Sequence, residues 1–215
     1  MSFRKGNRMN KIIKVLLSSF FCLSTLVACS SSPYAKAEAQ TLAIQGAPVY
    51  IEPDENTTQN DVDIFLKYLN KQPDYLINKC KKVYLQGDEP YFSSVEYDES
   101  SQSSVGYAQP VDYSIHLDIN NTKTLDRMTE SDVVSTITHE LWHLYDFSNG
   151  DGVKDLSDFE FLNLYNANPN SITEYGATDS AEFFAEAGAM YINNPEELMQ
   201  KNMDVYNYFE SLPKE

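Results

Sequence analysis

The feature that most constrains the fold of this 215-residue chain is an H-E-x-x-H motif formed by His139, Glu140 and His143. Histidines four residues apart lie on one face of an α-helix, one turn from each other, so both rings can reach one tetrahedral zinc ion. The glutamate beside the first histidine is then placed to accept a proton from a water molecule that the metal activates. The motif predicts a helix that holds one Zn²⁺ per chain, with Glu140 as the catalytic base.

A core helix that happens to carry two histidines is the alternative interpretation of the motif. The chain has only three histidines, and the residues around the motif are apolar at helical spacing. Two imidazoles and a carboxylate are costly to bury in such a helix unless they are paired or bind a metal. This cost favours the metal site. The apolar positions are Val133, Val134, Ile137, Leu141 and Leu144.

A catalytic zinc site needs a third protein ligand, and the sequence indicates a carboxylate. No histidine follows His143, and position 146 holds Asp where the common three-histidine motif has Gly. Glu182 and Glu186 are the strongest candidates because acids within a run of Phe and Ala are costly to bury without a partner. Glu182 can alternatively complete a capping box behind Asp179. The downstream acids available are Glu160, Glu174, Asp179, Glu182 and Glu186.

The motif, taken with the block E-Y-G-A-T-D-S-A-E-F-F-A-E-A at 174–187, resembles the anthrax lethal factor catalytic-domain family, which includes the secreted Pro-Pro endopeptidases. The resemblance covers roughly residues 110–212. It implies that Glu182 is the third ligand, that Tyr175 donates its hydroxyl to the oxyanion, and that Glu186 orients a ligand histidine. Asp146 is expected to support the site in a similar way. Trp142 departs from the family, which often has a small residue there, and we expect it to narrow a pocket or to pack against the sheet.

The pattern of the rest of the chain predicts an α+β fold of the zincin type. We expect a helix over 60–72, a strand over 82–85, an exposed loop over 94–104 and a hairpin from strands at 105–108 and 113–119. Helices are then expected over 129–147, 158–165, 179–193 and 195–212. A small mixed sheet packed with the active-site helix and followed by a mainly helical C-terminal half is the predicted architecture.

The first residues have the pattern of an export signal. A basic stretch precedes an apolar run, and Leu26-Val27-Ala28-Cys29 resembles a bacterial lipobox, which implies lipid attachment to Cys29. Cleavage after the A-x-A site at 35–37, giving a secreted protein, and a retained membrane anchor are the alternatives. We expect a signal peptide over 1–28, a flexible tether over 29–45 and a metallopeptidase domain over 46–215. Cys80 is then the last thiol and is predicted to be buried and structural.

Charge excludes one class of partner. Removal of residues 1–28 leaves 11 Lys and Arg against 32 Asp and Glu, a net charge of −21. Such a surface repels nucleic acid phosphates and anionic lipid. We therefore expect no nucleic acid partner, contact with the membrane only through the lipid on Cys29, and a monomer.

These features together predict a zinc metalloendopeptidase on the extracellular face of a bacterial membrane. It would cleave an extended segment of a peptide or protein. Two alternatives remain: a non-catalytic zinc- or peptide-binding lipoprotein of the same fold, and a toxin-like effector with one target. Retention of Glu140, Tyr175 and Glu182 favours catalysis. His116, the last histidine, lies on a strand with an apolar opposite face and is expected at the surface, or in the cleft if that strand pairs with substrate.

Overall fold

The computed structural model describes residues 35–87, 105–120, 130–149 and 159–214, all within the compact unit Ser31–Glu215. The segments 1–34, 88–104, 121–129, 150–158 and residue 215 lie outside the described residues. They contain the predicted signal peptide, the lipobox with Cys29 and the loop predicted over 94–104. Those predictions therefore stay predictions.

The centre of the fold is a mixed five-stranded sheet with the order β1-β2-β3-β5-β4. The central pairs β2–β3 and β3–β5 are parallel, and both outer pairs are antiparallel. Gln45 (φ 49°) and Gly46 (φ +89°) form the turn between β1 and β2, as a two-residue hairpin turn requires. The strands are β1 (Gln40–Ile44), β2 (Ala47–Glu52), β3 (Lys82–Gln86), β4 (Gly106–Gln109) and β5 (Ser114–Asp118).

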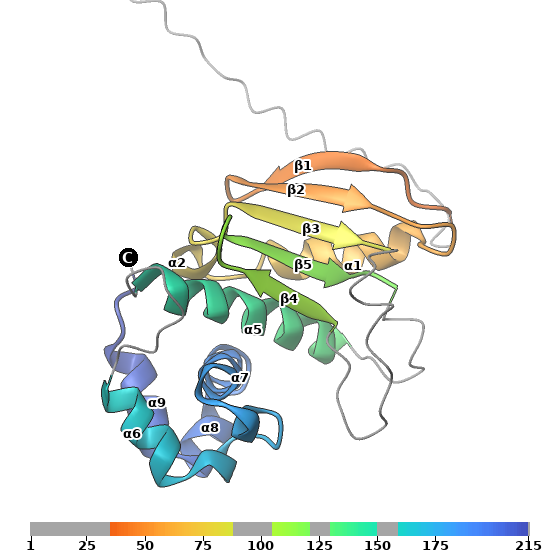
Figure 1. The fold of residues 1–215 in the computed structure, drawn as a ribbon. Helices are drawn as coiled ribbons and strands as arrows, with labels where there is room; N and C mark the ends of the chain where they lie inside the picture. The colour runs from red at the N-terminus through yellow and green to blue at the C-terminus, as the bar shows by residue number, and fades with distance from the viewer. Residues whose placement is uncertain (1–34, 88–104, 121–129, 150–158, 215) are drawn as a thin grey trace, which may run out of the picture. The chain divides into compact units, whose positions relative to one another are not determined.

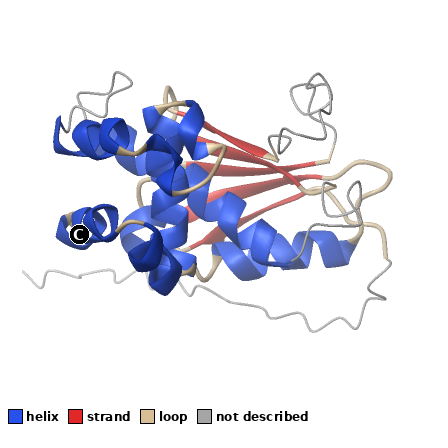
Figure 2. Ribbon diagram, turned by 90° about the horizontal axis from the view of Figure 1, so that it is seen from below, coloured by secondary structure: helices blue, strands red, loops and turns tan. Residues whose placement is uncertain are grey.

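One face of the sheet is buried in the hydrophobic core. Alternate residues of the central strands point to this face and are at most 1% exposed, as the two-residue period of a strand dictates. Three helices lie on it (Figures 1 and 2): α1 (Gln59–Leu69), α2 (Asp74–Ile77) and α5 (Glu130–Asn149). The helix α5 runs beside the edge strand β4 (Figure 1). The buried strand residues are Val49, Ile51, Val83, Leu85, Ile115 and Leu117.

The C-terminal half is helical, and its helix α7 packs along α5. The elements are α6 (Phe159–Ala167), the 3₁₀ turns η1 (Pro169–Ser171) and η2 (Gly176–Thr178), α7 (Ser180–Asn193), α8 (Pro195–Lys201) and α9 (Met203–Ser211). The single helix predicted over 195–212 is wrong, because the chain is extended at Asn202 (φ −157°, ψ 95°). The Asn202 side chain accepts a hydrogen bond from Val205 N and begins a new helix.

The predicted α+β fold is confirmed, and so is the hairpin of β4 and β5. The tether predicted over 29–45 differs from the structure at its C-terminal end, where Gln40–Ile44 form the edge strand β1. This strand was missed because only Leu42 and Ile44 turn apolar side chains toward the core, and so short an alternation does not distinguish a strand from a linker. Among the described helices, none has both the length and the apolarity to span a membrane.

Candidate metal centre

The helix α5 places the two histidines and Glu140 in the interior. Val133, Ile137 and Leu141 anchor the buried face of this helix, and each is at most 1% exposed. His139 and Glu140 are 8% and 6% exposed. The four-residue spacing brings His139 Nε2 within 3.0 Å of His143 Nε2, with the two rings nearly perpendicular at 79°.

The helix α7 brings a carboxylate to these two nitrogens. Asp179 caps α7 by accepting hydrogen bonds from Ala181 N (2.7 Å) and Glu182 N (3.0 Å). Glu182 Oε2 then lies 3.1 Å from His139 Nε2 and 3.4 Å from His143 Nε2. The structure therefore brings all three predicted ligands together, with their ligand atoms within 4.8 Å of one another.

The donor atoms of this group fit a metal ion. Glu182 Oε2 is buried, and no N–H or O–H points at it with hydrogen-bond geometry. A buried carboxylate oxygen without a donor is costly, and a cation between it and the two imidazoles would remove that cost. Two imidazole nitrogens and one carboxylate oxygen are ligands that catalytic zinc sites use, with a fourth position left open. The group His139, His143 and Glu182 can hold a metal ion.

Glu186, one helical turn after Glu182 on α7, contacts the opposite side of the His139 ring. Its Oε1 lies 2.9 Å from His139 Nδ1, which directs the Nε2 lone pair of that ring toward the group. Burial lowers the pKa of His139, but without a bound metal ion the Glu182 and Glu186 carboxylates outweigh it and raise the pKa to about 10. Burial acts to raise the pKa of Glu182, but the two histidines outweigh it, so its net pKa lies below the usual range.

The side chain of Glu140 projects from α5 toward the edge strand β4. The backbone N–H of Ala108 acts to lower the pKa of this carboxyl. A Cβ built on Gly106 would lie 3.1 Å from Glu140 Cγ and 3.2 Å from Glu140 Oε1. Burial raises the pKa of Glu140, although the two histidines act in the opposite direction. A carboxylate with a raised pKa is a stronger proton acceptor once it is ionised.

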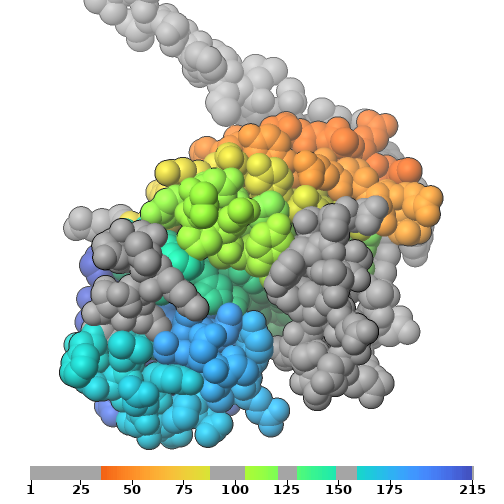
Figure 3. All heavy atoms as spheres, viewed as in Figure 1, coloured from red at the N-terminus to blue at the C-terminus, as the bar shows by residue number. Residues whose placement is uncertain are grey.

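Tyr175 approaches the group from the segment before α7. The ring is 38% exposed, and its centroid lies 5.9 Å from that of His139. Burial and the neighbouring carboxylate raise the pKa of Tyr175, so the phenol keeps its proton. In the space-filling view, atoms of α5 are visible between β4 and the segment before α7 (Figure 3).

Comparison with known proteins supports the architecture around this group. Among solved structures, the chain matches the Pro-Pro endopeptidase PPEP-2 from Paenibacillus alvei, with a TM-score of 0.53 and 19% sequence identity. The fold is similar to that of a Pro-Pro endopeptidase. The match covers 77% of this chain and 97% of the PPEP-2 chain. No protein-family model and no curated protein sequence matches the chain. The similarity to PPEP-2 concerns the fold.

Two predicted residues of α5 lie outside the three-ligand group. Asp146 is half-buried one turn after His143, and its expected supporting role stays a prediction. Trp142 is 1% exposed, and its expected effect on a pocket stays a prediction. Its ring packs in an aromatic cluster with Tyr75 of α2, Tyr145 of α5, Phe184 of α7 and Phe209 of α9.

His116 also lies outside the three-ligand group. It is half-buried on the sheet face opposite the core, where its ring stacks between Tyr84 and Tyr107 with centroids 4.5 Å and 4.4 Å away. Its Nδ1 contacts Gln86 Oε1 at 2.7 Å and its Nε2 contacts Ser114 Oγ at 3.2 Å. Tyr50 continues the row with a centroid 5.0 Å from that of Tyr84. His116 is thus part of a cross-strand aromatic row.

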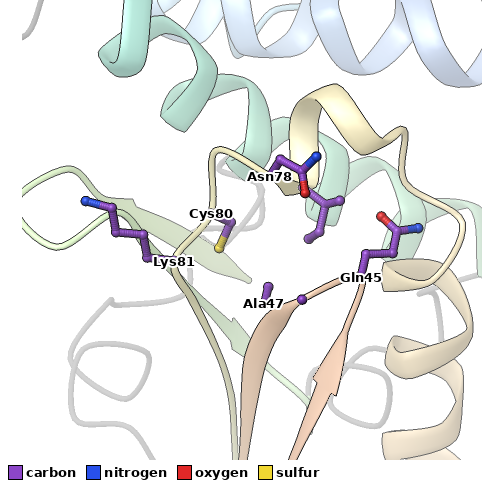
Figure 4. A pocket seen from close by; sticks show the side chains of 7 residues that line it. Gln45, Ala47, Asn78, Cys80 and Lys81 are labelled. Carbon is purple, nitrogen blue, oxygen red and sulfur yellow. The ribbon is translucent and has the colours of Figure 1, made fainter. Parts of the chain in front are cut away.

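Cys80 is buried and free, as predicted. Its Sγ lies 2.9 Å from Lys82 O, and burial raises the pKa of the thiol to about 11. It lines a pocket of about 360 Å³ between the β1–β2 turn and the segment after α2, together with Gln45, Ala47, Asn78 and Lys81 (Figure 4). A thiol with this pKa is a weak nucleophile at neutral pH.

Sequence reasoning missed the residues that surround the predicted ones. Gly106 and Ala108 support Glu140, and only the glycine inside a strand pattern was a signal for a close approach. Thr173 accepts a hydrogen bond from Gly176 N in a segment with no regular pattern, and no sequence signal pointed to it. The contacts of β4 with α5, and those of the η2 segment with α7, form only when these elements pack together in the folded protein.

Proposed function

We propose that this protein is a zinc metalloendopeptidase that hydrolyses a peptide bond in an extended substrate. The observation that carries the proposal is the buried carboxylate oxygen of Glu182, which faces His139 Nε2 and His143 Nε2 at 3.1 Å and 3.4 Å. This ligand set lies beside a buried glutamate and a half-exposed tyrosine. The similarity to the fold of a Pro-Pro endopeptidase supports the same conclusion.

The residues of the site have separable tasks. His139, His143 and Glu182 would hold the ion, and Glu186 fixes the His139 ring through Nδ1. Zinc, when bound, supplies Lewis-acid polarisation and lowers the pKa of water. Glu140 accepts the proton of the attacking water and delivers it to the leaving amine. Tyr175 keeps its proton at neutral pH and donates a hydrogen bond to the oxyanion of the substrate.

The proposed location is the extracellular face of a bacterial membrane, with lipid on Cys29. The lipobox-like Leu26-Val27-Ala28-Cys29 and the basic stretch before the apolar run support it. The net charge of −21 after removal of residues 1–28 supports neutral or basic peptide partners over nucleic acid. Labelling with a lipid precursor in the native host, compared between the wild type and Cys29→Ser, tests the anchor. Equal labelling of the two would contradict it.

The peptidase proposal is tested with the purified protein and its Glu140→Ala variant. Both are incubated with a diverse peptide library, with and without a zinc chelator, and the products are identified by mass spectrometry. Cleavage by the wild type that is abolished by the substitution and by the chelator is expected. Equal cleavage by both proteins in the presence of chelator would refute the proposal. Zinc binding without cleavage would favour a non-catalytic binding protein.

A further inference from the structure

His116 stands in a row of side chains that crosses the sheet on the face opposite the core. The strand register places Tyr84 of β3 and Tyr107 of β4 opposite His116 of β5, and these three strands lie side by side (Figure 1). The His116 ring is nearly parallel to both tyrosine rings, with interplanar angles of 13° and 5°. A histidine of one strand is therefore held between rings of its two neighbouring strands.

The hydrogen on His116 Nδ1 is fixed by Gln86. Gln86 Nε2 donates a hydrogen bond to Glu52 Oε2 at 2.9 Å, so the amide nitrogen faces that carboxylate and the amide oxygen is left to face His116. Gln86 Oε1 lies 2.7 Å from His116 Nδ1. Because an amide oxygen can only accept, Nδ1 must be the donor in this contact.

The hydrogen on His116 Nε2 is fixed by Ser114. The Ser114 hydroxyl donates to Asp112 Oδ1 at 2.7 Å, and its oxygen lies 3.2 Å from His116 Nε2. A serine hydroxyl has a single hydrogen, so with that hydrogen on Asp112 it presents only lone pairs to the ring. Ser114 is 0% exposed, and a bare Nε2 would leave two acceptors facing each other with no hydrogen between them. Nε2 therefore carries a hydrogen as well, which makes the ring a cation.

The surroundings of His116 favour this cation. A positive charge over the face of a tyrosine ring is attracted by the ring, and His116 has one such ring on each side. The Ser114 hydroxyl and Lys82 outweigh burial and lower the pKa of Asp112, so this carboxyl keeps its negative charge at neutral pH. Lys82 is the like charge, and its Nζ pairs with Asp112 Oδ2 at 3.0 Å. The ionisable groups of the described residues that face His116 are Tyr84 and Lys82 of β3, Tyr107 of β4, Asp112, Asp118 of β5, and Glu52 of β2 behind Gln86.

The stack reaches the edge strand β4. Within the described sheet, β4 pairs only with β5. Tyr107 lies on the face of β4 that carries the row, while Gly106 lies on the other face against Glu140. We propose that His116 is an imidazolium that clamps β4 to the sheet, and that loss of its charge as the pH rises loosens this strand. The inference goes beyond the proposed peptidase function, because neither zinc nor a substrate takes part in the clamp.

The charge of His116 is measured by NMR in protein labelled with ¹⁵N-histidine. Protonated and bare ring nitrogens have well-separated nitrogen shifts, and the His116 signals are identified by their absence in His116→Asn. Both nitrogens should carry hydrogens at neutral pH. The midpoint of the titration should lie about 1 pH unit or more above the value of ~6.5 for a free imidazole.

Asp112→Ala tests the hydrogen-bond network around the ring. Without this carboxylate, the Ser114 hydroxyl can donate to His116 Nε2, so the neutral ring is favoured. The midpoint of the His116 titration should fall by about 1 pH unit. Asp204→Asn removes the same charge at an exposed position of α9 and should leave the midpoint unchanged.

Hydrogen exchange of the β4 amides measures the clamp. A histidine whose midpoint is raised in the folded protein stabilises fully below about pH 6.5, and this stabilisation is lost as the pH rises through the folded value. A midpoint lowered by about 1 pH unit corresponds to about a 10-fold change in the opening equilibrium. At pH 5.5, the β4 amides of Asp112→Ala should therefore exchange about 10-fold faster than those of the parent protein. At pH 9, the two proteins should exchange at nearly equal rates.

Three results would overturn the inference. They are a bare ring nitrogen on His116 at pH 7, a midpoint that Asp112→Ala leaves unchanged, and exchange that is faster by the same factor at both pH values, which would assign the effect of Asp112 to the turn before β5. If Asp112→Ala does not fold, the parent protein still decides the question. Its β4 amides, compared with those of β3 and corrected for the intrinsic pH dependence of exchange, should lose about 10-fold in protection between pH 5.5 and 9. Constant protection would overturn the clamp. Zinc affinity and peptide cleavage enter none of these measurements, so failure of the peptidase proposal leaves the test intact.

Discussion

Gly188 of α7 lies directly against the indole ring of Trp142 on α5, and a Cβ built on Gly188 would be only 2.5 Å from Trp142 Cγ. The contact sets how closely the helix with Glu182 approaches the helix with His139 and His143. Trp142 cannot move away easily, since it is 1% exposed and surrounded by other aromatic rings.

Gly188→Ala is therefore expected to destabilise the protein by about 1–3 kcal/mol through overpacking. The free energy of unfolding is measured by urea denaturation, together with zinc affinity, which should fall because the helices separate. In a variant that combines Gly188→Ala with Trp142→Phe, the smaller phenyl ring leaves room for the methyl group of the alanine. The double variant should be more stable than the sum of the two single losses predicts, and strict additivity would argue against the contact.

Glu182→Gln should reduce zinc affinity by more than the 10- to 100-fold that loss of an outer partner of a ligand typically costs. The amide oxygen carries no negative charge to offset that of the ion. Glu174→Gln removes an exposed acid from the preceding segment and is the matched control. Zinc content after dialysis against a weak chelator reports the result. If Glu182→Gln retains as much zinc as the Glu174→Gln control, Glu182 is not a ligand.

Gly106→Ala should lower kcat/KM toward a cleaved peptide by about 10-fold while zinc content stays unchanged. The added Cβ would meet Glu140 Cγ and Leu117 Cδ2, each at 3.1 Å, so Glu140 must shift by a few tenths of an ångström. A misplacement of about 1 Å can cost about 10²-fold, and a smaller shift should cost less. Gln109→Ala, exposed on the same strand, provides the control. Full activity in Gly106→Ala would mean that β4 does not position Glu140.

Acid should weaken the fold through Asp54. Burial raises the pKa of this carboxyl, but hydrogen bonds from Asn120, Thr57 and Asn56 outweigh it and lower the pKa to about 2. Since the folded value lies below the unfolded one, the stabilisation is present above about pH 4 and is lost as the pH falls toward 2. Asp54→Asn should remove about 1 kcal/mol at neutral pH and flatten the stability curve between pH 4 and 2.

Urea denaturation between pH 7 and 2 measures this effect. Glu55→Gln, at the exposed neighbouring position, should leave the curve parallel to that of the wild type. If Asp54→Asn keeps the slope of the wild type between pH 4 and 2, the hydrogen bonds to Asp54 do not contribute to acid stability.

Cys80 should resist alkylation in the folded protein. It is 4% exposed, and its raised pKa of about 11 leaves little thiolate at pH 8. Iodoacetamide labelling of the Cys80 peptide, followed by mass spectrometry, should be slow without denaturant and fast in urea. Labelling at equal rates under both conditions would contradict the burial of this thiol.

The three residues on α5 could be found from the sequence because their geometry is local. The four-residue spacing of His139 and His143 is the helical repeat, and their helix was recognised from its own apolar pattern. The start of α7 was equally local, since Asp179 caps it with its own side chain. Which carboxylate faces the histidines depends on contacts between distant segments. The spacing in the sequence left two roles open for Glu182, a metal ligand or a capping-box residue.

The tertiary structure decided that choice and the surroundings of the site. Packing of α7 on α5, with Gly188 against Trp142, turns Glu182 toward the two imidazoles instead of back to its own N-terminus. Packing of β4 on α5 brings Gly106 to Glu140, and packing of the η2 segment on α7 brings Gly176 to Glu186. The sequence by itself determined the helix, the pair of histidines and the acid beside them, because backbone hydrogen bonds dictate such spacings. Contacts between distant segments depend on how whole elements pack, and only the folded chain sets them.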